Sequence, residues 1–63
     1  MALENQVIIV TGGGSGIGRQ ASFQLAAKGA TVVVADFNEA GAKETVATIE
    51  KDGGKAASEH LLP

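Results

Sequence analysis

A glycine-rich stretch between two regular segments constrains this chain most. Residues 11–18 read TGGGSGIG and follow a short β-branched run at residues 7–10. A short β-branched run that ends abruptly in glycines is typical of a buried parallel strand. Residues 16–28 then show the four-residue spacing of a helix, with the apolar positions Ile17, Ala21 and Leu25. The order strand, glycine loop, helix indicates an α/β fold.

A second strand and a second helix follow. Residues 31–35 are again rich in β-branched side chains, and the run ends at Asp36. Asn38 is a good N-cap for a helix that begins at Glu39 and ends before the glycines at 53 and 54. We therefore predict the β-α-β-α portion of a doubly wound parallel sheet, a Rossmann fold that is incomplete, over residues 1–55. Residues 56–63 fit neither a strand nor a helix, and we expect an irregular C-terminal tail there.

The glycine positions suit the binding of a dinucleotide. Gly12 permits the tight turn after the strand, Gly16 lets the backbone approach a pyrophosphate, and Gly18 lets the helix lie close to the strand. The N-terminus of the helix offers N–H groups and a positive dipole to the anion. We also include Ser15, through its hydroxyl and N–H, and Ile17, through its N–H, among the candidate phosphate ligands.

The glycine loop admits two other interpretations. A flexible glycine hinge is disfavoured because an acidic residue, Asp36, closes the second strand 18 positions beyond Gly18, near the spacing of about 20 in dinucleotide-binding folds. A triphosphate-binding P-loop would need Lys and Ser or Thr after Gly18, and the chain has Arg19 and Gln20 there.

Asp36 indicates which dinucleotide binds. Its carboxylate can accept hydrogen bonds from the ribose hydroxyls of NAD, whereas the 2′-phosphate of NADP would face a like charge. Two like charges about 4 Å apart repel by up to about 4 kcal/mol at an effective dielectric near 20, which favours NAD by about tenfold or more. No basic residue offsets this, because Ser15 and Phe37 occupy the neighbouring positions of the site. The alternative, that Asp36 only caps the second helix, is weaker because Asn38 fills that role better.

The motif Thr11-Gly12-x-x-x-Gly16-Ile17-Gly18 resembles the cofactor motif of the short-chain dehydrogenase/reductase family. The resemblance extends over roughly residues 4–55, and within the family it looks closest to 3-oxoacyl-carrier-protein reductase-like and glucose dehydrogenase-like members. It implies a Rossmann fold, a nicotinamide cofactor, and hydride transfer between that cofactor and a carbonyl or alcohol.

The chain departs from the family in its catalytic residues. The resemblance implies a catalytic Ser, a Tyr-x-x-x-Lys pair and usually an Asn, yet the chain contains no tyrosine. Ser15, Ser22 and Ser58 lie in the cofactor half or the tail, and residues 58–62 do not resemble the family's third strand with its adenine-binding Asp. We therefore predict no catalytic residue and an NAD-binding fragment that is inactive alone. A non-catalytic nucleotide-binding or interaction module, and a non-functional truncation product, remain as alternatives.

Composition excludes several other classes of function. Seven acidic and five scattered basic residues give a net charge of −2, so we expect solvated basic side chains and no nucleic-acid partner. The chain has no cysteine and one histidine, His60, which we interpret as a solvated tail residue. One histidine cannot hold a metal alone, so no metal site is predicted.

No segment reaches the roughly 20 apolar residues of a membrane span, so no membrane partner is expected. The first residues, 1–6, contain no basic residue and do not form a secretory signal. With no cysteine either, we expect a cytoplasmic location.

Self-association is expected from the handedness of the fold. Right-handed crossovers place both helices on one face of the sheet, which leaves alternate side chains of residues 7–10 and 31–35 uncovered. A chain of 63 residues buries a small core. We therefore expect a marginally stable monomer that associates through the uncovered face, and weak binding of the cofactor.

Overall fold

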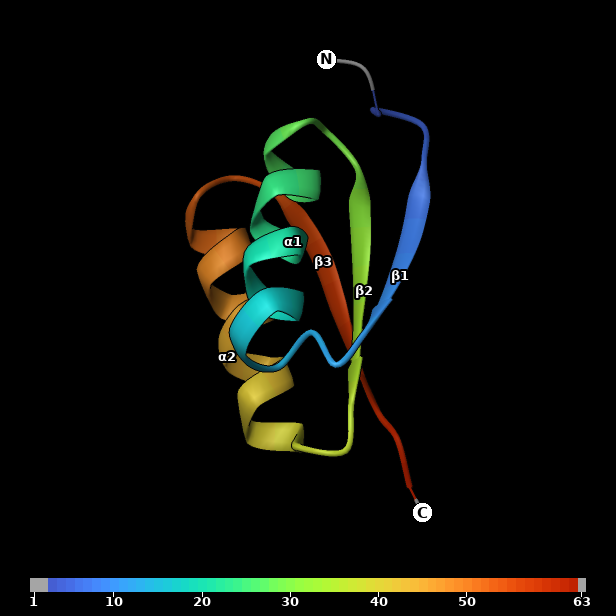
Figure 1. The fold of residues 1–63 in the computed structure, drawn as a ribbon. Coiled ribbons are helices and arrows are strands. Elements are labelled where there is room, and N and C mark those ends of the chain that lie inside the picture. Colours follow the sequence, from blue (N-terminus) through green and yellow to red (C-terminus); the bar gives the residue numbers. More distant parts are fainter. Residues whose placement is uncertain (1–2, 63) are drawn as a thin grey trace.

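The computed structural model describes residues 3–62 as one three-stranded sheet with two helices (Figure 1). Met1 and Ala2 of the predicted Rossmann segment, and Pro63 of the predicted tail, lie outside the described residues. The elements in chain order are β1 (Val7–Thr11), α1 (Gly16–Ala27), β2 (Thr31–Asp36), α2 (Glu39–Lys51) and β3 (Lys55–His60).

The sheet is parallel, and β2 lies at its centre, between β1 and β3. In the middle of the sheet Ile9 pairs with Val33, and Val33 pairs with Ala57. Both helices lie on the same side of the sheet (Figure 1). The predicted fold class, an incomplete Rossmann-type α/β fold, is confirmed.

The predicted irregular tail at residues 56–63 is wrong over most of its length. Residues from Lys55 to His60 form β3, which pairs with the full length of β2. The segment contains Ala, Ser and Glu, which favour strands only weakly in isolation. The free edge of β2 supplies hydrogen-bonding partners, and Ala56 packs against the core, so tertiary context decides the conformation.

The core lies between the sheet and the helices. Val32 and Val34 of β2 are fully buried, and they meet Ala42 and Ile49 from α2. The helix-facing side chains of β1 are only partly buried, since β1 is an edge strand. The core is therefore centred on β2 and α2.

The ends of α2 follow the predicted signals. The Oδ1 of Asn38 accepts a hydrogen bond from the N–H of Gly41 at 3.0 Å, which makes Asn38 the N-cap of α2. Gly29 after α1 has φ 99° and Gly53 after α2 has φ 87°. These left-handed residues end both helices in the way that glycine allows.

Within residues 3–62, the helices are too short and too polar to cross a membrane. The same residues contain no group of three side chains suited to hold a metal ion.

Candidate functional site

The glycine loop lies at the carboxyl ends of β1 and β2, where parallel α/β sheets bind ligands. The N–H of Gly12 donates to the carbonyl of Ala35 at 2.7 Å, so the loop begins hydrogen-bonded to β2. Gly12 has φ 71° and Gly16 has φ 56°. Both values lie in the left-handed region that glycine adopts without strain, which explains these two positions in the motif.

Close packing explains Gly18. A Cβ atom at this position would overlap the carbonyl oxygen of Gly12. The first turn of α1 therefore rests directly on the backbone that leaves β1. The predicted reason for this glycine, close approach of helix and strand, matches the geometry.

The N-terminus of α1 is open to an anion. Ser15 precedes the helix in an extended conformation, and its side chain makes no capping hydrogen bond. The first turn holds no acidic residue, and the side chain of Ile17 is 90% exposed. Because neither a side-chain cap nor an acidic residue of the first turn occupies this helix end, its free N–H groups can accept a phosphate.

Asp36 lies beside this loop. Its Oδ2 accepts a hydrogen bond from the N–H of Gly14 at 2.8 Å, and its Oδ1 accepts one from the N–H of Asn38 at 3.0 Å. The N–H groups of Asn38 and Gly14 lower the pKa of the Asp36 carboxyl below its ordinary value. The group is therefore an anion at neutral pH, and each oxygen keeps a lone pair for a further donor.

Phe37 and His60 lie at the edge of the site. The Phe37 side chain is 62% exposed, and its carbonyl lies 3.0 Å from the Nε2 of His60. The Nδ1 of His60 is 3.9 Å from a carboxylate oxygen of Glu39. His60 is therefore the last residue of β3 and touches the turn after Asp36. Its assignment to an irregular tail is wrong, although its side chain is exposed as expected. No local signal predicts this contact, because it depends on β3, which the sequence patterns did not indicate.

The Arg19 side chain hydrogen-bonds to the glycine loop and to α2, a role that the sequence patterns did not indicate. Its Nη2 donates to the carbonyl of Gly14 at 2.6 Å and to the carbonyl of Gly41 at 3.2 Å. Its Nε donates to the Oγ1 of Thr45 at 2.9 Å, and its Nη1 lies 2.8 Å from a carboxylate oxygen of Glu44. The expectation that Arg19 is a solvated helix residue is wrong, since its side chain is 26% exposed and joins α1, the loop and α2.

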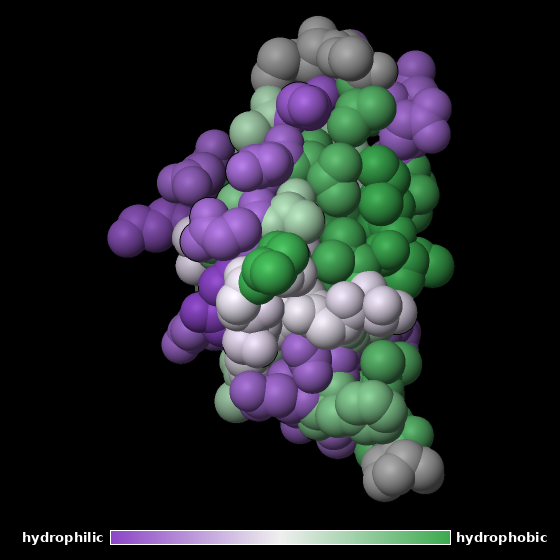
Figure 2. Space-filling view, in the orientation of Figure 1, coloured by the Kyte–Doolittle hydropathy of each residue, from purple (hydrophilic) through white to green (hydrophobic). Residues whose placement is uncertain are grey.

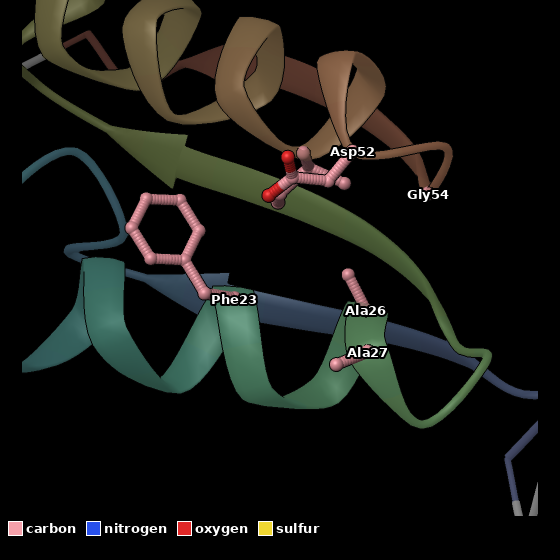
Figure 3. Close-up of a pocket in the computed structure, with 6 residues that line it drawn as sticks. Phe23, Ala26, Ala27, Asp52 and Gly54 are labelled. Atoms are coloured by element: carbon pink, nitrogen blue, oxygen red, sulfur yellow. The ribbon is translucent and has the colours of Figure 1, made fainter.

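A separate hollow of about 120 Å³ lies between the two helices (Figure 3). Phe23 and Ala26 line it from α1, and Asp52 lines it from the end of α2. It lies toward the carboxyl ends of the helices, away from the glycine loop. Since ligands of such folds bind at the carboxyl ends of the strands, the loop is the better candidate site.

Comparison with known proteins identifies the family to which the chain belongs. The family model described as short chain dehydrogenase matches residues 6–60. An uncharacterised oxidoreductase of Thermotoga maritima is 44% identical over 57 residues, which are 90% of this chain and 23% of that protein.

Solved structures of dehydrogenases are similar to this chain as well. The citronellol catabolism dehydrogenase AtuB of Pseudomonas aeruginosa superposes with a TM-score of 0.92 at 42% identity, over 95% of this chain and 25% of that one. A 7α-hydroxysteroid dehydrogenase, solved with NADH and 7-oxo glycochenodeoxycholic acid, superposes with a TM-score of 0.92 at 37% identity, over 95% of this chain and 24% of that one. The chain thus spans about a quarter of the length of these relatives. The finer resemblance to acyl-carrier-protein reductases or glucose dehydrogenases stays a prediction.

Proposed function

The chain belongs to the short-chain dehydrogenase family, and from this premise we propose that residues 12–18 and Asp36 bind the adenosine diphosphate half of NAD. The family as a whole consists of oxidoreductases that use nicotinamide cofactors, and one structural relative was solved with NADH. The site residues of the proposal are Gly12, Ser15, Gly16, Ile17, Gly18, Asp36 and Phe37.

The observation that carries the proposal is the position of the Asp36 carboxylate beside the glycine loop. The hydrogen bond from Gly14 to Asp36 brings a ribose acceptor next to the amino end of α1. A dinucleotide needs these two groups together, because its pyrophosphate and its adenosine ribose are neighbours. At Gly16 an added Cβ would meet no protein atom within 4 Å, so the space over the loop is free for a phosphate.

Electrostatics favours NAD over NADP. Asp36 carries a negative charge beside the proposed ribose position, whereas the exposed Ser15 and Phe37 are neutral. Arg19 is the nearest cation to the loop within residues 3–62, but its guanidinium is engaged by Glu44 and by backbone carbonyls. Among the described residues, a 2′-phosphate would therefore meet the Asp36 anion while Arg19 is held by its own partners.

The chain's own contribution is cofactor binding. NAD, when bound, supplies the hydride acceptor. The 63 residues contain no tyrosine, so the proton-transfer role that a tyrosine fills in this family has no candidate here. We propose that hydride transfer between the nicotinamide and a carbonyl or alcohol requires residues outside this segment. Binding without catalysis is also what a nucleotide-binding module would show.

Titration of the ¹⁵N-labelled chain by NMR tests the proposal. We expect NAD to shift the amide resonances of residues 12–18 and Asp36, and to bind about tenfold more tightly than NADP. In Asp36→Ala this preference should largely disappear, while Glu50→Ala, an exposed residue on α2, should retain it.

Binding of neither cofactor would contradict the proposal. Shifts confined to the hollow between the helices would contradict the assigned site. Equal affinities for NAD and NADP in the unchanged chain would contradict the role of Asp36.

A further inference from the structure

The loop that joins β1 to α1 has an outer side, open to solvent, and an inner side that faces α2. Figure 2 shows near-neutral hydropathy over the outer side, between the hydrophilic helices and the hydrophobic residues of β1. On the inner side, the carbonyl of Gly14 accepts a hydrogen bond from the Nη2 of Arg19 at 2.6 Å. The carbonyl of Gly13 accepts one from the Oγ1 of Thr45 at 2.9 Å, and this hydroxyl in turn accepts from the Nε of Arg19 at 2.9 Å. Arg19 therefore holds one carbonyl of the loop directly and the preceding one through Thr45.

These inner contacts decide where the N–H groups of the loop point. A trans peptide sets its C=O and its N–H in opposite directions, and the described residues contain no cis peptide bond. Because the carbonyl of Gly14 points to Arg19, the N–H of Ser15 points to the outer side of the loop. Ser15 is exposed, and within the described part of the chain its N–H has no hydrogen-bond partner. By the same rule, the N–H of Gly14 points away from Thr45, and it meets the Oδ2 of Asp36 at 2.8 Å.

The first half of α2 fixes the Arg19 side chain and compensates its charge. An added Cβ at Gly41 would lie 2.6 Å from the carbonyl oxygen of Gly14, so this glycine lets α2 approach the loop. The carbonyl of Gly41 accepts from the Nη2 of Arg19 at 3.2 Å and lies 3.1 Å from the Oγ1 of Thr45. The Nη1 of Arg19 is 2.8 Å from a carboxylate oxygen of Glu44. Arg19 is thus paired on the inner side, where it orients the loop and is not itself a ligand of an anion on the outer side.

We propose that Arg19 is a positioning residue of the cofactor site. It fixes the peptide between Gly14 and Ser15 so that the N–H of Ser15 faces the pyrophosphate of the bound dinucleotide. Thr45 fixes the preceding peptide, and through the N–H of Gly14 it holds Asp36 at the ribose. A donor that is oriented before binding loses less freedom on binding, which raises the affinity. This inference rests on the proposed function, since it assigns the two sides of that same site to two inner residues.

NMR titrations of the chain with ADP and with adenosine test the inference. Both ligands carry the ribose, and only ADP carries the pyrophosphate. A variant that merely lowers the folded fraction weakens the apparent affinity for every ligand by the same factor, so the ratio of the two dissociation constants reports the site alone. In Arg19→Met we expect the affinity for ADP to fall by about tenfold more than that for adenosine. In Thr45→Val both affinities should fall together, with little change in their ratio.

Two controls separate orientation from charge. Lys43→Met removes a cation from the exposed side of α2 and should leave both dissociation constants unchanged. At about 1 M salt the Debye length is about 3 Å, so a long-range attraction between Arg19 and the pyrophosphate would be screened. The excess loss of ADP affinity in Arg19→Met should persist there, because the orientation of a peptide does not depend on ionic strength.

The amide resonance of Ser15 gives a measure that needs no variant and holds even if Arg19→Met fails to fold. In the unchanged chain, ADP should move the amide proton of Ser15 downfield, as a hydrogen bond to a phosphate oxygen does. Adenosine should move it much less, because it has no phosphate to accept this bond.

Four results would overturn the inference. An unchanged ratio in Arg19→Met would do so and leave the proposed function standing. A loss of ADP affinity that vanishes in high salt would show that Arg19 acts through its charge. Binding of ADP without a shift of the Ser15 amide proton would exclude this N–H as a ligand. A chain that binds no ADP would contradict the proposed function itself, and the inference with it.

Discussion

The carboxylate of Asp36 accepts a hydrogen bond from the backbone N–H of Gly14 at 2.8 Å. The two residues are 22 positions apart in the sequence, so the bond joins the end of β2 to the loop after β1. An added Cβ at Gly14 would stand 2.7 Å from the same carboxylate oxygen. The contact therefore depends on a glycine at position 14 as well as on the acid.

This contact makes stability depend on pH. The N–H groups of Asn38 and Gly14 lower the pKa of Asp36 in the folded chain, whereas the unfolded value is about 3.9. The stability contributed by the carboxylate is therefore fully present above the unfolded pKa and is lost as the pH falls through the folded pKa. We expect Asp36→Asn to lower the urea midpoint at about pH 7, and the difference to shrink at about pH 3.

Glu50→Gln is the control, because it removes an exposed carboxylate from α2 with no contact to the loop. Its urea midpoint should follow that of the unchanged chain at both pH values. A deficit of Asp36→Asn that is the same at pH 7 and in acid would show that the carboxylate charge is not what stabilises the turn.

Replacing Gly16 and replacing Gly18 should each destabilise the chain, but for different physical reasons. An alanine at position 18 would overlap the carbonyl of Gly12, and we expect a loss of about 1–3 kcal/mol in the free energy of unfolding. In a helix, alanine is otherwise favoured over glycine by about 1 kcal/mol. A net loss of stability in Gly18→Ala would therefore reflect the steric overlap with Gly12. Gly16→Ala meets no atom within 4 Å but places a side chain at φ 56°, at a cost of about 1–2 kcal/mol.

Asparagine separates the two mechanisms, because it tolerates the left-handed conformation better than alanine does. Gly16→Asn should recover part of the stability that Gly16→Ala loses, whereas Gly18→Asn should be at least as damaging as Gly18→Ala. Urea denaturation followed by circular dichroism measures all four variants. Equal losses for alanine and asparagine at position 16 would rule out backbone strain as the cause.

Local signals explain what could be predicted from the sequence. The β-branched runs, the four-residue spacing of apolar positions, and the caps at Asn38, Gly29 and Gly53 are all encoded within a few residues of the element that they define. The shared face of the two helices then follows from the handedness of parallel crossovers. The proximity of Asp36 to the loop follows as well, because both lie at the carboxyl ends of adjacent strands.

The features that could not be predicted from the sequence depend on contacts between residues far apart in the chain. The strand β3 has few β-branched residues, and its conformation comes from pairing with β2. His60 could not be assigned to the turn after Asp36 while β3 was unknown. Arg19 has the appearance of a surface residue in the helix pattern, and only the packing of α1 against α2 reveals its partners.

The bridging role of Arg19 leads to the last prediction. Its guanidinium donates to the carbonyls of Gly14 and Gly41, and to Thr45, which is fully buried. We expect Arg19→Met to lower the free energy of unfolding by about 1–3 kcal/mol, because these acceptors lose a charged donor. Arg19→Lys should recover little, since a single ammonium cannot reach acceptors in three directions as the planar fork does.

Lys43→Met is the matched control for this prediction. Lys43 lies 3.8 Å from Glu39 on the exposed side of α2, with both side chains more than half exposed, and such a pair contributes less than about 0.5 kcal/mol. Hydrogen exchange at the amides of residues 12–16 should become faster in Arg19→Met and not in Lys43→Met. If the two variants unfold at the same urea concentration, Arg19 stabilises the chain no more than an ordinary surface cation does.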